Sequence, residues 1–494
     1  MGKKIPMWAV LLTLAFSVVM FMYSQNVFGK LLGDAFACDY GDMHIPLLIS
    51  AVFAALIALC FGWKWSVMEK GILASIDRAM VALLTLLAVG LMISSWIASG
   101  VVPAMIYYGL KIITPSAFLV TACILSLIVA LATGSSWTTL GTIGVALIGI
   151  GGAMGFSPGA TAGAAIVGAY AGDKMSPLSD TTLMAPAVSG TDVFTHIRHM
   201  MYTVTPSFVI SLVVFFILGL RTSGVSETSQ IIEMQEALAA NFNINPWLLL
   251  PPLVVVAIVV FKIPALPGLA AGVAMGCVMG CIFQDMSFGE WFSILHYGFR
   301  FADTTGIPAT VVDLLTRGGM SSMLWTLNMT LCVMCFAGIM DATGMMKTIT
   351  DWLLSRAKGR GSLVLVTVLT CICINVIACS QYLSILLTGR MYKRAYEDAR
   401  LKPENLSRVL EDAGTVTSPL VPWNSCGVTL LALMGVPTMV YFPYAVLCYI
   451  NPIISVIYGY TGFSMTKMTD AEYEKVMALR AEEDAKEAAA AAGA

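Results

Sequence analysis

The sequence is short of charge. Only 11% of its 494 residues are Asp, Glu, Lys or Arg, whereas 58% are hydrophobic, and soluble globular proteins carry about 25% charged residues. So few charges do not cover a water-facing surface, which excludes a soluble globular protein and makes lipid the main solvent. The net charge of −2 gives no indication of a nucleic-acid partner, and none is expected.

Motifs for metal binding and catalysis are also missing. The 12 cysteines are scattered, and no CxxC pair has a second pair or histidines to match it, so zinc sites and disulfide frameworks are not expected. Residues 155–159 fit the GxSxG pattern of a nucleophile elbow, but they lie in an apolar, glycine-rich turn with no histidine nearby. The Walker A motif is absent as well. We therefore expect neither an enzyme nor a cofactor.

Long apolar runs are what the sequence has in quantity. A membrane-spanning helix needs roughly 17–25 apolar residues. Runs of this kind lie near 7–27, 44–63, 78–99, 116–133, 200–220, 247–262, 264–283, 326–344, 361–378 and 436–460. Between 134 and 190, and again between 379 and 432, the sequence is apolar but interrupted by Gly, Pro, Ser, Thr and charges. The pattern predicts a polytopic all-α membrane protein with two interrupted regions.

The distribution of basic residues predicts the orientation. Lys and Arg cluster at 3–4, 64–78, 347–360, 390–408 and 467–486. By the positive-inside rule these segments face the cytoplasm, together with both termini. The sequence then divides into a first transmembrane repeat (1–221), an external linker (222–245), a second transmembrane repeat (246–464) and a cytoplasmic low-complexity tail (465–494).

A short motif occurs twice. Residues 171–178 read AGDKMSPL and residues 413–420 read AGTVTSPL, and two weaker pairs keep nearly the same offset: IASG (97–100) with DATG (341–344), and GSSWTT (134–139) with CSQYLS (379–384). Each half crosses the membrane an odd number of times, so the two repeats have inverted topology, which is typical of secondary transporters. We expect their broken or re-entrant helices to meet at mid-membrane.

The two Ser-Pro breaks predict an ion site. Pro177 and Pro419 interrupt the helices, and unpaired backbone groups are tolerated in a membrane only inside protein or along a wet cavity. The freed carbonyls and nearby side-chain oxygens suit a small hard cation, for which Na⁺ is the precedent in transporters. The predicted ligands are Ser176, Ser179, Thr181, Thr417, Ser418, Asn424 and Ser425. Na⁺ itself is expected at Asp180, Ser179 and Thr181.

Carboxylates in the apolar regions complete the candidate site. Asp180 is the first choice for exchanging Na⁺ and a proton, because a desolvated carboxylate is costly when it is ionised and unpaired. The further candidates are Asp173, Lys174 and Asp341. Lys174 needs an acidic partner, which Asp180, Asp341, Glu411 or Asp412 could supply. Two alternatives stay open: a solvated loop pair formed by Asp173 and Lys174, and a helix-capping role for Asp180.

The motif region also resembles a known family. Four segments resemble the NhaC family of sodium/proton antiporters, within the ion-transporter superfamily: GAYAGDKMSPLSDTT (168–182), VFTHIRHMMYTVTPSFVISL (193–212), SSWIASGVVPAMIYYGLKII (94–113) and LEDAGTVTSPLVPWNSCGV (410–428). The resemblance implies exchange of Na⁺ for H⁺ across a bacterial inner membrane. A branch that resembles malate/lactate antiporters leaves small carboxylates open as substrates. A channel, a membrane protein without transport activity and a homodimer also stay open.

Overall fold

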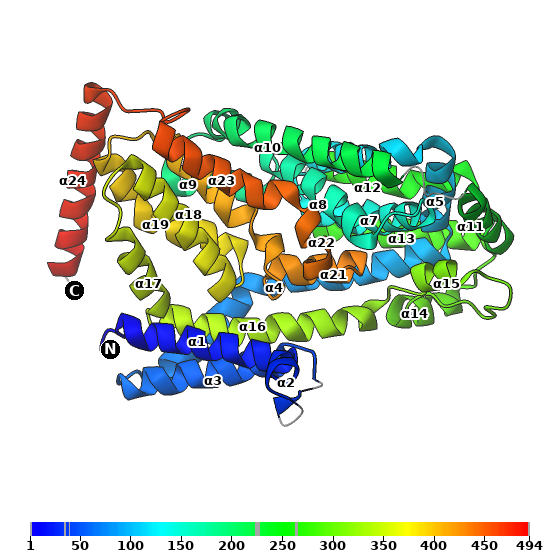
Figure 1. Ribbon diagram of the computed structural model, residues 1–494, viewed down its shortest axis with the longest axis horizontal. Coiled ribbons are helices and arrows are strands. Elements are labelled where there is room, and N and C mark those ends of the chain that lie inside the picture. The colour runs from blue at the N-terminus through cyan, green and yellow to red at the C-terminus, as the bar shows by residue number, and fades with distance from the viewer. Residues whose placement is uncertain (1, 34–35, 39, 223–227, 262–264, 493–494) are drawn as a thin grey trace.

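The computed structural model describes residues 2–33, 36–38, 40–222, 228–261 and 265–492 (Figure 1). The described chain is helical, apart from turns and one isolated β-bridge between Leu401 and Lys467. Eight of its helices are long and apolar enough to cross a membrane, or up to ten if each of two bent helix pairs counts as one span. The predicted all-α polytopic fold is confirmed.

The first half of the chain runs from the N-terminus to α10. Its helices are α1 (Met7–Ser24), α2 (Val27–Leu32), α3 (His44–Cys60), α4 (Trp65–Ala98), α5 (Val101–Ile112), η2 (Pro115–Ala117), α6 (Phe118–Thr133), α7 (Ser136–Ala153), α8 (Pro158–Met175), α9 (Asp180–Ser189) and α10 (Val193–Thr222).

The second half begins after α10. It contains α11 (Thr228–Asn241), η3 (Pro246–Leu249), α12 (Leu250–Val260), α13 (Ala265–Phe283), α14 (Phe288–Tyr297), α15 (Ala309–Leu315), η4 (Met320–Met323), α16 (Leu324–Ala342), α17 (Met345–Leu354), α18 (Arg360–Ile377), α19 (Gln381–Asp398), α20 (Pro403–Val409), η5 (Leu410–Thr415), η6 (Ser418–Leu420), α21 (Ser425–Met434), α22 (Thr438–Tyr441), η7 (Phe442–Tyr444), α23 (Val446–Thr461) and α24 (Asp470–Ala492).

Matching helix caps show that the two halves repeat one another. Gly100 and Gly344 both precede a helix in the left-handed conformation (φ 82° and 72°), which glycine adopts without steric cost. Ser135 and Ser380 both cap the helix that follows them, and each hydroxyl accepts a hydrogen bond from the backbone N–H three residues later. These pairs are 244 and 245 residues apart, the offsets of the weak sequence matches.

The two halves run in opposite directions. In Figure 1, α4 leads to α5 at the right end of the molecule, whereas α16 leads to α17 at the left end. The hairpin of α18 and α19 lies in the left half of the same view, and α7 lies in the right half. Ser135 and Ser380, at the tips of the α6–α7 and α18–α19 hairpins, line the same cavity, so the two tips meet from opposite ends. This arrangement is the expected inverted repeat.

The helices form two layers. One layer, here called the scaffold, contains α1, α3, α4 and α16, with α13 packed on α4, and the other, here called the core, contains α7–α10, α18, α19 and α21–α23 (Figure 1), with α6 packed on α8 and α20 packed on α10. In the scaffold, α3 packs on α16 and α13 packs on α4, so each half covers the long helix of the other half. The core places the two broken segments beside each other, facing α4 and α16.

The structure corrects one prediction from the sequence and adds detail to two other regions. The segment predicted as a linker (222–245) contains a helix, α11, which is bent by 102° against the helix that follows it. The prediction that the apolar run 436–460 spans as one helix is wrong, because the chain turns around Pro437 and Pro443 and α23 begins only at Val446. The tail predicted to be of low complexity forms α24.

Ion pairs hold α24 against the rest of the protein. Lys402 contacts Glu472 at 2.8 Å, and Arg480 contacts Asp398 at 2.6 Å. The hydrogen bond from Lys402, together with backbone and side-chain hydrogen bonds from Thr469, lowers the pKa of Glu472 to about 2. Glu472 therefore stays ionised, and its pair with Lys402 is complete, throughout the neutral range.

Candidate ion site

The first broken segment lies between α8 and α9. Ser176 has an extended backbone (φ −84°, ψ 124°), and Pro177 follows it, so the helix stops at Met175. Helix α9 starts again with Ser179 as its cap. The Thr182 hydroxyl donates to the carbonyls of Asp173 and Lys174, at 3.2 and 3.1 Å, and so satisfies backbone groups that the break leaves unpaired.

The second broken segment contains a wide helical turn. Residues 410–415 form a π-turn, and the N–H of Val416 donates to the Glu411 carbonyl five residues earlier, at 3.3 Å. Helix α21 starts after Asn424, whose side chain caps it. A π-helical turn is rare and is found frequently at functional sites.

The predicted oxygen ligands of the second segment are engaged within the protein. The Thr417 hydroxyl donates to the Ala413 carbonyl, and the Ser418 hydroxyl donates to the Thr415 carbonyl. The Asn424 amide donates to the Asn375 carbonyl at 2.9 Å. These three side chains satisfy the backbone around the break, which is the first requirement of non-helical backbone at membrane depth.

A buried ion pair joins the two segments. The Lys174 ammonium lies 2.7 Å from Asp412 Oδ1, and both side chains are fully buried. The same oxygen accepts hydrogen bonds from Asn451 at 2.7 Å and from Thr203 at 3.0 Å. Of the four acidic partners considered for Lys174, the structure selects Asp412. The alternative of a solvated loop pair formed by Asp173 and Lys174 is wrong, because both residues are buried.

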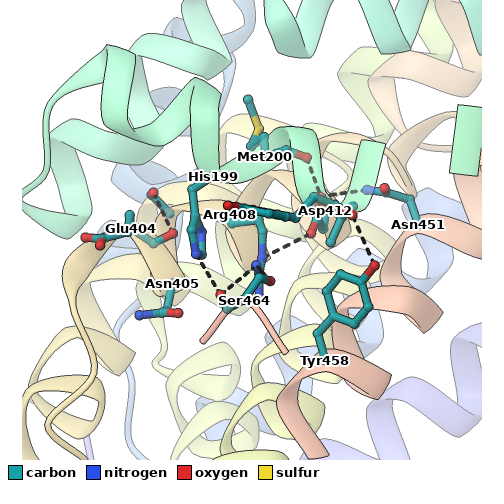
Figure 2. A network of polar contacts seen from close by, with 12 residues as sticks. His199, Met200, Glu404, Asn405, Arg408, Asp412, Asn451, Tyr458 and Ser464 are labelled. Atoms are coloured by element: carbon teal, nitrogen blue, oxygen red, sulfur yellow. Dashed lines mark hydrogen bonds and ion pairs between the residues drawn. The ribbon is translucent and has the colours of Figure 1, made fainter. Parts of the chain in front are cut away.

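Arg408 lies on the other side of Asp412. Its Nε is 3.9 Å from Asp412 Oδ2, and its Nη1 donates to the carbonyl of Ser464 at 3.2 Å (Figure 2). The His199 ring contacts the same carbonyl at 2.8 Å. Figure 2 shows Arg408 between Ser464 and Asp412, so the turn after α23 anchors the guanidinium that faces the ion pair.

Asp173 keeps one oxygen open. Its Oδ2 accepts a hydrogen bond from the N–H of Ser136 at 3.1 Å, at the start of α7, where the helix dipole favours a negative charge. Its Oδ1 is buried and has no hydrogen-bond partner among the described residues. The residue is 6% exposed. A carboxylate held at one oxygen and open at the other is suited to take up a proton or a cation.

The buried charges do not balance. Five side chains make up what we call the charge cluster, in which each charge interacts with another member: Asp173, Lys174, Arg408, Glu411 and Asp412. Three carboxylates face two cations, so the cluster carries one surplus negative charge when all five groups are ionised. Burial makes such a surplus costly. One bound proton or one bound monovalent cation removes it.

A cavity of about 470 Å³ lies beside the cluster. Helices α4 and α16 of the scaffold line one side, and the starts of α7, α9, α19 and α21 line the other. Asp173, Ser179 and Thr181 reach it from the first broken segment, and Ser425 reaches it from the second. Four helix N-termini, each a site of positive potential, therefore surround one cavity.

The remaining predicted residues have distinct places. Asp180, expected to be desolvated, is exposed and lies at the cavity as the first residue of α9, and Ser179, rather than Asp180, is the cap. The Ser176 hydroxyl accepts from the N–H of Leu178 at 3.3 Å. Asp341 lies away from the cluster and pairs with Arg78 at 3.0 Å. Arg78 also lines the cavity.

Sequence reasoning misses three members of this network: Thr203, Arg408 and Asn451. None of them lies in either copy of the repeated motif (171–178 and 413–420), so only the packing of α10, α20 and α23 reveals their role. Glu411 and Asp412 precede the second copy of the motif directly. The sequence presents them only as partners for Lys174 and not as part of the ion site.

Inverted repeats, two broken helices and a charged site between them define a secondary transporter. The chain belongs to the Na⁺/H⁺ antiporter family, whose model matches residues 4–184 and 168–463. The two matches overlap at the first broken segment.

Curated relatives cover most of the chain. The Na⁺/H⁺ antiporter NhaC of Alkalihalophilus pseudofirmus is 37% identical over 86% of this chain and 92% of its own length. The arginine/ornithine antiporter ArcD of Halobacterium salinarum is 36% identical over 86% and 88%. The malate-2H⁺/Na⁺-lactate antiporter of Bacillus subtilis is 34% identical over 85% and 89%. The family resemblance is confirmed, and the relatives are named for the exchange of different solutes.

The first prediction concerns the buried ion pair. Lys174→Met leaves the Asp412 carboxylate with Arg408 as its nearest cation, at 3.9 Å. Removing one partner of a buried pair costs about 3–5 kcal/mol, so thermal unfolding in detergent should show a large loss of Tm. The double variant Lys174→Met/Asp412→Asn should recover much of this loss, because the amide oxygen still accepts from Thr203 and Asn451.

Lys393→Met is the matched control. Lys393 lies on α19 outside the charge cluster and is only partly buried, so its loss should change Tm little. Equal Tm values for Lys174→Met and Lys393→Met would contradict a structural role of the pair.

Proposed function

We propose that the protein exchanges Na⁺ for H⁺ across the bacterial inner membrane by alternating access. The observation that carries this proposal is the open oxygen of Asp173, which is buried at the broken helix and belongs to a residue that lines the cavity. The surplus charge of the cluster supports mutually exclusive occupancy, since either one proton or one Na⁺ neutralises it. Competition for one site that opens alternately to each side is sufficient for exchange.

The layered architecture supports alternating access. The cavity lies between the scaffold helices α4 and α16 and the core helices that carry the broken segments. A displacement of the core relative to the scaffold would open this cavity first toward one end of the molecule and then toward the other, and the ion site would move with the core. Inverted repeats make two such states similar in structure, because each half can adopt the conformation of the other.

The distribution of charge supports the orientation. The start of α1 and helix α24 lie at the same end of the molecule, the left end in Figure 1. Basic segments 347–360 and 390–408 belong to α17–α18 and α19–α20 at this end. By the positive-inside rule we assign this end to the cytoplasm.

The second prediction tests Asp173. Asp173→Asn keeps an oxygen for the Ser136 N–H but removes the charge, so membrane insertion and Tm should persist while Na⁺-dependent proton flux in everted vesicles is abolished. In the wild type, apparent Na⁺ affinity should weaken as pH falls, because protons and Na⁺ compete. Asp303→Asn, in an exposed loop, is the control and should behave as the wild type. Undiminished exchange by Asp173→Asn would refute the assignment.

A second candidate function is exchange of a small organic carboxylate together with Na⁺ and H⁺. The observation that favours it is the size of the cavity, about 470 Å³, whereas one water molecule occupies only about 30 Å³. Four helix N-termini at its wall suit a carboxylate group, and Arg78, which is also paired with Asp341, lies there too. Two of the relatives are named for the exchange of lactate and malate or of amino acids.

The third prediction separates the two candidates. Purified protein in proteoliposomes loaded with malate, lactate or arginine should take up the same labelled solute by counterflow if the cavity binds organic substrates. Arg78→Gln should then reduce uptake about tenfold, the effect of losing about 1.4 kcal/mol, because it removes the cation at the cavity wall.

Arg356→Gln is the control for this experiment. Arg356 is exposed and does not line the cavity, so its loss should leave counterflow unchanged. Uptake equal to that of protein-free liposomes, with intact Na⁺/H⁺ exchange, would contradict organic-substrate exchange. Na⁺/H⁺ exchange would then be the remaining candidate function.

A further inference from the structure

Glu411 is the buried acid that the hydrogen-bond network leaves out. Its side chain is fully buried, and neither carboxylate oxygen accepts a hydrogen bond from any part of the chain that the structure describes. Buried polar groups are normally paired, and each exception needs an explanation. The Lys174 ammonium and two hydroxyls lie near this carboxylate, but none of them makes a hydrogen bond to it in the described structure, so hydrogen bonding alone does not account for an acidic residue at this position.

The surroundings of Glu411 are rich in oxygen. The groups that interact with its carboxylate are the Lys174 ammonium, the Asp173 carboxylate and the hydroxyls of Thr181 and Thr415. The Thr415 hydroxyl and Asp173 Oδ1 are themselves buried without a hydrogen-bond partner in the described structure. Open oxygens from the end of α8 and from the π-turn therefore face the start of α9, where Thr181 lies.

The π-turn explains how two adjacent acids take different roles. Glu411 and Asp412 are consecutive in the turn 410–415. Asp412 points to Lys174, Thr203 and Asn451, and its Oδ1 is fully engaged. Glu411 is left to face the first broken segment. The ion pair of Asp412 therefore fixes the turn that places Glu411.

We propose that Glu411 completes a Na⁺ site with the Asp173 carboxylate and the hydroxyls of Thr181 and Thr415. This inference rests on the proposed function, since it names the ligands of the transported ion. Carboxylate and hydroxyl oxygens are hard ligands, which a small hard cation prefers. A cation between Glu411 and Asp173 would coordinate the open oxygens and would also neutralise the surplus negative charge. Lys174 alone does neither.

The fourth prediction is a binding measurement on the full-length protein. Binding of ²²Na⁺ to purified protein in detergent should weaken about tenfold or more in Glu411→Gln, corresponding to about 1.4 kcal/mol or more. Glu404→Gln is the matched control, because Glu404 is also buried but accepts from the Thr466 hydroxyl, outside the cluster. It should bind Na⁺ as the wild type does. Unchanged affinity in Glu411→Gln would overturn the proposal.

A second variant keeps the test independent of folding. Thr415→Val removes a hydroxyl that has no hydrogen-bond partner in the described structure while preserving the shape of the side chain, so it should fold even if Glu411→Gln does not. It should also weaken Na⁺ binding, and unchanged binding would count against the site.

The two proposals fail in different ways. Loss of binding in Asp173→Asn together with wild-type binding in Glu411→Gln and Thr415→Val would refute the Glu411 site and leave the proposed function intact. Wild-type protein that binds Na⁺ with the predicted dependence on Glu411, but moves no protons in vesicles, would refute the proposed exchange and leave the site intact.

Discussion

The ion pair between Lys174 and Asp412 is the contact on which the site depends. It joins the end of α8 in the first half to the π-turn in the second half, across 238 residues of sequence, and no solvent reaches either group. Because two buried charges are separated only at a large cost, the two broken segments stay together as one unit. Asp173 and Glu411 are therefore held on neighbouring segments with their open oxygens inside the protein.

The same pair leaves the site one negative charge in excess. Lys174 and Arg408 both approach Asp412, so Asp173 and Glu411 are left with fewer cations than carboxylates. In a membrane interior this imbalance favours capture of one proton or one small cation. The neighbouring cavity lies between scaffold and core and is lined by Asp173 of the cluster. The proposed exchange thus rests on the placement of five charged side chains.

Sequence alone predicts the features that local chemistry encodes. A Ser-Pro pair within an apolar region predicts each helix break, and hydropathy predicts the membrane spans. The inverted repeat can therefore be predicted from the sequence. The partner of Lys174 cannot be predicted in this way, because the sequence offers four acidic residues. Only tertiary packing brings Asp412 Oδ1 to 2.7 Å from the Lys174 ammonium. Asp180 is expected to be desolvated, yet as the first residue of α9 it faces the cavity. Nothing in the local sequence distinguishes the role of Glu411 from that of Asp412. The π-turn orients the two side chains differently, and no amino-acid pattern predicts that turn.

The most direct test of the account is the number of protons released when Na⁺ binds. Purified protein in weakly buffered detergent solution, titrated with NaCl against choline chloride as the ionic-strength control, would report this number through a pH indicator. A charge cluster with one surplus negative charge predicts that the number of protons released for each Na⁺ bound rises toward one as pH falls and the ion-free site becomes protonated, and falls toward zero at high pH. Saturable Na⁺ binding with no proton release over the whole range from about pH 6 to 9 would contradict it, because Na⁺ and H⁺ would then not share the site.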